Sequence, residues 1–220
     1  GDSAAGVMLD SAADMAVAVN PNNNDIYTTS GVSFPNGSEQ YVAYTFNNGS
    51  LIANLYTNGV LVGTQAYPNN SYTPGNIGGA GGTTVNALGN DIYGDTQFQG
   101  TIYEFRIWHG AVSPLYLAVS AAAGPGMVVS SLTPTAVHIS VNTSQVGGQT
   151  QQASATADFT AVSGVPLTGS ITNWTSSNPS VLTVNSNGVI TAVNVGSATI
   201  SGMLNGVTGT SALITVQTSG

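Results

Sequence analysis

Residues 41–64, YVAYTFNNGSLIANLYTNGVLVGT, hold the clearest pattern of local structure in this chain. Two Asn-Gly pairs, at 48–49 and 58–59, divide the stretch into three largely apolar runs. Asn and Gly tolerate the positive φ that a tight hairpin turn requires. The stretch therefore predicts a three-stranded antiparallel meander, and the rest of the chain must cover its faces and edges.

The composition limits which classes of protein this can be. At 220 residues and 41% hydrophobic content, the chain has room for two modest domains with packed cores. Only 5% of its residues are charged, whereas soluble domains carry about 25%. Arg106 is the only basic residue, so binding to nucleic acid or to anionic lipid is excluded. No segment has the ~20 apolar residues needed for membrane insertion.

The few charges are unevenly placed. Eight of the nine carboxylates lie at or before Glu104, and after Arg106 the only charged side chain is Asp158. A surface with so few charges is typical of a protein that packs against copies of itself or that is glycosylated. The alternative interpretation is an acidic extracellular protein with a polar surface, and the sequence favours neither of the two. The chain has no cysteine, which excludes disulfides and thiol chemistry.

Around the meander, weak strands are expected at 7–9, 15–19 and 26–29. A further strand is expected over 97–108, with Ile102, Glu104 and Arg106 on one face and Thr101, Tyr103, Phe105 and Ile107 on the other. Glu104 and Arg106 then lie side by side, which favours a structural ion pair over a catalytic one.

A short helix should follow this strand. Ser113 can cap it, Pro114 suits its first turn, and Gly124 can end it. The run Gly124-Pro125-Gly126 then marks the best domain boundary in the sequence.

The second half of the chain predicts a β-sandwich of seven short strands. They are expected at 135–142, 150–158, 171–176, 181–185, 189–193, 197–203 and 210–217.

Two stretches resemble known families. LYTNGVLVGT at 55–64 and LGNDIYGDTQFQGTIYEFRIWHGAVSPLYLAVSAAAGP at 88–125 resemble the carboxy-terminal half of a bacterial laminin-G-like, concanavalin-like jelly roll. ITNWTSSNPSVLTVNSNGVITAVNVGSATISG at 171–202 resembles the bacterial Ig-like group 2 domain. These resemblances imply an all-β protein: a jelly-roll sandwich over 1–125, apparently truncated on its amino-terminal side, a linker at 126–134 and an Ig-like sandwich over 135–220. They also imply that Trp174 is the core tryptophan of the second sandwich.

Several residues are candidates for binding. Asp91 and Asp95, in a loop at the rim of the jelly roll, are candidate calcium ligands, although a solvated turn is the more frequent reason for such a pair. Tyr67, Tyr72, Tyr93 and Trp108 are candidates for a sugar-stacking patch, with packing as the alternative. Glycosylation sequons occur at Asn36, Asn48, Asn69, Asn142 and Asn173.

Nothing in the sequence predicts an enzyme. The only histidines are His109 and His138, and no motif of a hydrolase or metalloprotease is present. No cofactor is expected unless calcium binds. Two hypotheses remain for this extracellular or cell-surface chain. One is a structural subunit of a fibre, sheath or layer, which pairs with copies of itself or with a missing portion of its jelly roll. The other is an adhesin or carbohydrate-binding module that recognises glycans.

Overall fold

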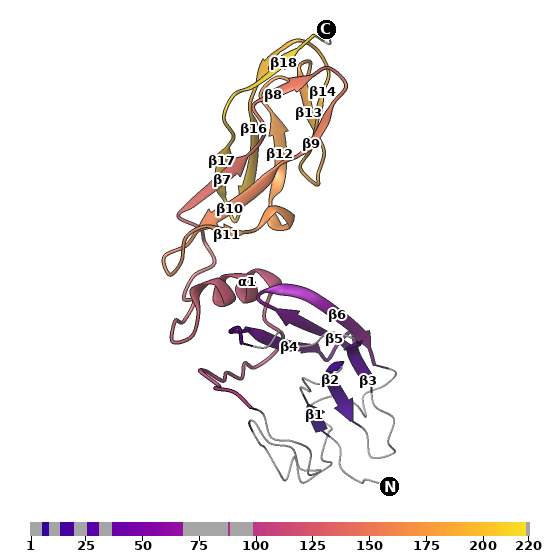
Figure 1. The fold of residues 1–220 in the computed structure, drawn as a ribbon, viewed down its shortest axis with the longest axis vertical. Coiled ribbons are helices and arrows are strands. Elements are labelled where there is room, and N and C mark those ends of the chain that lie inside the picture. The colour runs from indigo at the N-terminus through magenta and orange to yellow at the C-terminus, as the bar shows by residue number, and fades with distance from the viewer. Residues whose placement is uncertain are drawn as a thin grey trace. The chain divides into compact units, whose positions relative to one another are not determined.

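The computed structural model describes residues 6–8, 14–19, 26–30, 37–67, 88 and 99–218, the first three ranges by their backbone alone. The chain divides into two compact units, Gly1–Leu117 with Gly124–Gly126 and Ala118–Ala123 with Met127–Gly220. The division falls within the helix that follows the first sheets. The protein consists of all-β sandwiches, as the sequence predicts (Figure 1).

The meander of the first unit is confirmed. It comprises β4 (Val42–Asn47), β5 (Ile52–Thr57) and β6 (Val60–Ala66), paired antiparallel in that order. Between β5 and β6, Asn58 and Gly59 both have positive φ, at 50° and 79°. This is the two-residue hairpin turn that the sequence predicts.

The first connection differs from the prediction. Asn48 and Gly49 do not form a two-residue turn, because β4 and β5 are joined through four residues and the positive φ, 55°, falls on Leu51. The Asn47 side chain explains the change, since its Oδ1 accepts hydrogen bonds from the backbone N–H groups of Gly49 at 2.9 Å and Ser50 at 3.1 Å. An Asn side chain that binds the backbone two residues on builds a wider turn.

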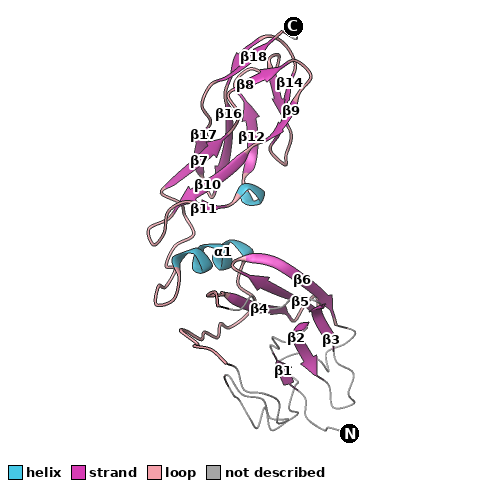
Figure 2. Ribbon diagram, in the orientation of Figure 1, coloured by secondary structure: helices cyan, strands magenta, loops and turns pink. Residues whose placement is uncertain are grey.

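Three strands precede the meander, close to the predicted positions. They are β1 (Gly6–Met8), β2 (Asp14–Val19) and β3 (Ile26–Ser30), in an antiparallel sheet of that order. On the carboxyl side, α1 (Pro114–Ala123) is the predicted helix (Figure 2). Ser113 caps it by accepting a 3.2 Å hydrogen bond from the N–H of Tyr116, and Gly124 ends it with a φ of 78°. Within the described part of the chain, no helix is long and apolar enough to cross a bilayer.

Both faces of the meander are packed. One face carries Ala43 and Tyr56, which form a buried cluster with Leu117 of α1. The other carries Ala53, which packs with the buried ring of Tyr67. The strand expected over 97–108 is not formed in its described part, because residues 99–108 join no ladder there.

The second unit is a sandwich of short strands. They are β7 (Ala136–Ser140), β8 (Ser144–Val146), β9 (Thr150–Gln152), β10 (Ser154–Asp158), β11 (Val165–Pro166), β12 (Thr172–Ser176), β13 (Leu182–Val184), β14 (Val189–Ala192), β15 (Gly196–Ala198), β16 (Ile200–Leu204), β17 (Val207–Thr210) and β18 (Ile214–Gln217). They pair in the orders β11-β10-β7, β12-β16-β17, β13-β14-β9 and β15-β18-β8.

Two of the predicted strands, 150–158 and 197–203, are broken in two, and the one expected at 210–217 coincides with β18 and only the last residue of β17. The chain changes pairing partner at Ala153, so that β9 pairs with β14 whereas β10 pairs with β7. A similar break at Thr199 separates β15 from β16, and residues 211–213 separate β17 from β18. The strand β8, which pairs parallel to β18, was not predicted. Alternation of apolar residues continues through such breaks, so the pattern alone does not show them.

The indole of Trp174 on β12 is buried, with 9% of the residue exposed. Two glycines make room for it. A Cβ on Gly188 would lie 2.9 Å from Cζ2 of the indole, and one on Gly202 would lie 3.1 Å from Cε3 and also against Cγ2 of Ile171. Real Cβ atoms essentially never come within 3.0 Å of another heavy atom, so a methyl group on Gly188 would displace the indole and one on Gly202 would displace Ile171.

Gly202→Ala should lower the free energy of unfolding of the second unit by about 1–3 kcal/mol, because the added methyl group overpacks the site. Gly147→Ala is the matched control: its Cβ would meet nothing within 4 Å, so the change should stay within about 0.5 kcal/mol. Urea unfolding followed by Trp174 fluorescence in a Trp108→Phe background measures both, since the chain has two tryptophans. Equal urea midpoints for Gly202→Ala and Gly147→Ala would contradict the close packing at Gly202.

Asp158, the last residue of β10, forms hydrogen bonds with three neighbouring segments. One carboxylate oxygen lies 2.9 Å from Nε2 of His138, and the other accepts a 2.8 Å hydrogen bond from the N–H of Gly164. Its carbonyl accepts a 2.7 Å bond from the N–H of Thr135. The hydrogen bond with His138, and then the one from Gly164, lower the pKa of the Asp158 carboxyl.

This lowered pKa predicts a stabilisation that is present above the unfolded-state pKa of about 3.9 and is lost as pH falls through the folded-state value. Asp158→Asn should therefore destabilise the second unit at neutral pH, and its difference from the parent should shrink in acid. Urea midpoints across that pH range measure the effect. Glu39→Gln, which removes an exposed carboxylate of the first unit, is the control. It should leave the urea midpoint of the second unit unchanged at every pH. If the urea midpoints of the parent and of Asp158→Asn differ by the same amount at every pH, the ionised carboxylate is not the cause of the difference.

Candidate functional site

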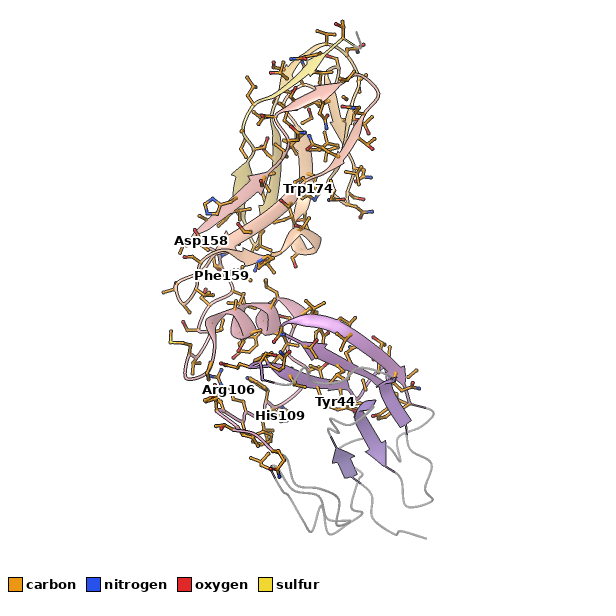
Figure 3. The ribbon with its side chains drawn as sticks, in the orientation of Figure 1. Tyr44, Arg106, His109, Asp158, Phe159 and Trp174 are labelled. Atoms are coloured by element: carbon orange, nitrogen blue, oxygen red, sulfur yellow. The ribbon has the colours of Figure 1, made fainter. Side chains whose placement is uncertain are left out.

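Of the four aromatic residues predicted to stack on sugar, Tyr67 is used in packing. It is 4% exposed, its hydroxyl lies 2.7 Å from that of Tyr44, and its ring centroid lies 5.2 Å from that of Phe46. Figure 3 labels Tyr44 on the meander. Burial, and then the bond to Tyr67, raise the pKa of Tyr44, and burial raises that of Tyr67. This pair is a neutral polar contact within the core.

Trp108 is half-buried and meets the ring of Tyr116 edge to face, with centroids 5.9 Å apart and planes at 79°. Tyr72 and Tyr93 lie outside the described residues, as do Asp91 and Asp95. Tyr67 and Trp108 are thus both engaged in packing contacts, and sugar stacking and calcium binding stay predictions. Among the side chains that it does describe, no three His, Asp or Glu groups gather as metal ligands would.

Glu104 and Arg106 form an ion pair on the segment before α1, where Figure 3 labels Arg106. The second carboxylate oxygen of Glu104 accepts a 3.0 Å hydrogen bond from the N–H of Gly126, which follows the helix. The bond from Arg106, and then the one from Gly126, lower the pKa of the Glu104 carboxyl, and the same pairing raises the pKa of Arg106. The pair thus ties this segment to the turn after α1, which is a structural role.

The opposite side of this segment is apolar and exposed. Tyr103 is 68% exposed, Phe105 59% and Ile107 83%, whereas the intervening Arg106 and the following Trp108 are half-buried. Exposure alternates only from Phe105 to Trp108, because residues 101–105 are all exposed, Ile102 on the other face among them at 47%. Sequence reasoning did not single out these three residues as a surface. Their spacing of two residues, which puts them on one face of an extended segment, is the signal that could have identified this surface.

The remaining candidates are single surface groups. His109 is exposed (labelled in Figure 3), and His138 pairs with Asp158. The sequon residues Asn48, Asn142 and Asn173 are exposed, while Asn36 and Asn69 lie outside the described residues. Asn142 uses its Oδ1 to accept a 3.1 Å bond from the N–H of Ser144. Glycosylation at all five stays a prediction.

A depression of about 290 Å³ in the second unit lies between β12 and β13 and is lined by Trp174, Thr175, Ser176, Pro179, Thr183 and Val184. None of these side chains is charged, and none is a nucleophile with a neighbouring base. The depression offers no means of fixing a ligand beyond hydroxyl groups and one apolar edge.

Comparison with protein families matches residues 132–215 to the bacterial Ig-like domain (group 2). It matches residues 1–118 to the concanavalin A-like lectin/glucanases superfamily. A search of curated proteins gave no match. Domains of these two kinds are typical of extracellular and surface proteins, and lectin-like and Ig-like domains are typically non-catalytic. By the match over more than half of its length, the chain belongs to the concanavalin A-like lectin/glucanases superfamily, with a bacterial Ig-like domain following.

Proposed function

We propose that this chain is a non-enzymatic structural subunit of an extracellular fibre, sheath or layer. Copies would assemble through contacts between β-sandwiches, with strand donation among those contacts. The two domain families support an extracellular setting. Neither identifies an assembly, so the proposal rests on the surface of the chain itself.

The observation that carries the proposal is the neutrality of the second unit. Its single carboxylate, Asp158, is bound to His138 and Gly164. The exposed faces of its strands instead carry hydroxyl groups that bond across strands, such as Ser201 with Thr210 at 2.8 Å and Ser197 with Thr215 at 3.2 Å. Soluble domains normally use charge to keep copies apart. With a single carboxylate in the whole unit, such surfaces can approach one another closely and with little Coulomb repulsion.

Assembly of this kind should increase with protein concentration and should respond little to NaCl, because it does not depend on ion pairs. Sedimentation velocity from micromolar to millimolar concentration, at low and high salt, measures both properties, and negative-stain electron microscopy shows the form of the product. A chain that stays folded and monomeric at millimolar concentration would exclude the structural subunit.

An adhesin or carbohydrate-binding module is the alternative, favoured by one finding: the superfamily that residues 1–118 match includes lectins. Because Tyr67 and Trp108 are engaged in packing, such a site would use Tyr72, Tyr93, Asp91 and Asp95.

For that alternative, a glycan array with and without calcium should show specific binding that Tyr93→Ala and Asp95→Ala abolish, the latter through loss of the ion. Glu39→Ala removes an exposed carboxylate elsewhere in the first unit and should leave binding intact. Absence of any glycan ligand, or binding that survives both substitutions, counts against this alternative.

A further inference from the structure

The pair Asn-Gly occurs five times in this chain, at 36–37, 48–49, 58–59, 187–188 and 205–206. In such a pair the backbone nitrogen of glycine can attack the side-chain amide carbon of the asparagine, because glycine has no Cβ to hinder the approach. The new C–N bond closes a succinimide ring and the C–NH2 bond breaks, which releases ammonia. Water then opens the ring and leaves aspartate or isoaspartate. The structure describes all of these pairs except the first, since Asn36 lies outside the described residues.

Two of the pairs are protected by a hydrogen bond from the glycine nitrogen, which must lose its proton before it can attack. The N–H of Gly49 donates to Oδ1 of Asn47 at 2.9 Å. The N–H of Gly188 donates to the carbonyl of Asn185 at 3.0 Å, and Gly188 is also buried against the indole of Trp174. A hydrogen bond donated by an N–H group favours its protonated form, so both nitrogens are poor nucleophiles.

A third pair is protected through the asparagine, whose amide must turn toward the glycine nitrogen. Both ends of the Asn58 amide are bound. Its Oδ1 accepts from the N–H of Tyr41 at 2.9 Å, and its Nδ2 donates to Gln40 at 2.8 Å. Two hydrogen bonds therefore have to open before Asn58 can react.

The pair Asn205-Gly206 has the weakest protection of the four. It forms the turn between β16 and β17, with φ of 45° and 87°, and both residues are exposed. Within residues 99–218 the N–H of Gly206 donates no hydrogen bond, and a Cβ on this glycine would meet nothing within 4 Å. One hydrogen bond holds the amide: Nδ2 of Asn205 donates to the carbonyl of Leu132 at 2.8 Å. A single opening of this bond frees the amide beside an available nitrogen.

We propose that Asn205 is a site of spontaneous deamidation and that the reaction breaks the bond between this turn and Leu132. The product carries a carboxylate, which accepts hydrogen bonds but donates none. It cannot bind the carbonyl of Leu132, which also only accepts. The second unit then carries a second side-chain carboxylate besides Asp158. This site does not depend on the proposed self-association, although the added charge falls on the unit whose neutrality supports it.

Peptide mapping by mass spectrometry after incubation in alkaline buffer measures the reaction at each pair. Chymotrypsin is a suitable protease because the chain has one basic residue. In the folded chain Asn205 should deamidate about tenfold faster than Asn58 or Asn187, since protected groups react only from rarer open states. In concentrated urea the rates should converge, because every pair then has the same local chemistry. A folded chain in which Asn205 reacts no faster than Asn58, or a difference that persists in urea, would overturn the site.

Asn205→Asp reproduces the charge of the product and tests its effect on Leu132. Asp-Gly suits the same hairpin turn as Asn-Gly, so the variant should fold. Backbone amides of residues 130–133 should exchange with deuterium about two- to tenfold faster than in the parent, as expected for the loss of one hydrogen bond.

Asn187→Asp is the matched control for this exchange measurement. It adds the same charge to another exposed turn of the second unit, at a side chain that forms no hydrogen bond within the described part of the chain. Exchange in residues 130–133 should then match that of the parent. Unchanged exchange in β7 and β16 shows that each variant is folded. Equal exchange of residues 130–133 in the two folded variants would overturn the coupling to Leu132.

Discussion

A chain with one basic side chain can form few ion pairs, so in the described residues its loops are held in place mainly by neutral hydrogen bonds. The side-chain amides supply most of them. Asn47 closes the first turn of the meander, and Asn58 fastens the second by accepting the N–H of Tyr41 at 2.9 Å while donating to Gln40 at 2.8 Å. In the second unit, the Nδ2 of Asn205 reaches back to the carbonyl of Leu132 at 2.8 Å. Each such bond contributes about 0.5–1.5 kcal/mol, little of which depends on pH or salt.

Two of the described carboxylates are used where the backbone changes direction. Glu104 accepts from Arg106 and from the N–H of Gly126, and Asp158 binds His138 together with the N–H of Gly164. In each case a carboxylate joins one charged or polar side chain to one backbone donor in a turn that contains glycine. Bonds to a charged acceptor are about twice as strong as neutral ones. These two carboxylates thus fix turns by bonds stronger than those of the neutral amides.

The features that could be predicted from the sequence are those with a local cause. The Asn58-Gly59 turn needs only the positive φ of its two residues, and α1 needs only Ser113 before it and Gly124 after it. The position of Glu104 beside Arg106 follows from a period of two. Features set by distant partners could not be predicted. The break at Ala153 arises because the residues before it pair with β14 and those after it pair with β7. The burial of Tyr67 depends on its contacts with Tyr44 and Phe46 of β4. The wider first turn shows that a local signal can also be overridden by its neighbour, here Asn47.

The parallel pairing of β8 with β18 has a mechanical consequence. Near the start and the end of the second unit, Ser144, Gln145 and Val146 lie beside Thr215, Val216 and Gln217 in the same direction. When the chain is pulled from both ends, two strands arranged in this way slide past each other. The bonds between them, including that from the N–H of Thr215 to the carbonyl of Thr143 at 2.8 Å, are then loaded together and not opened one at a time. The second unit should therefore resist tension applied along the polypeptide better than a domain whose terminal strands open one bond at a time.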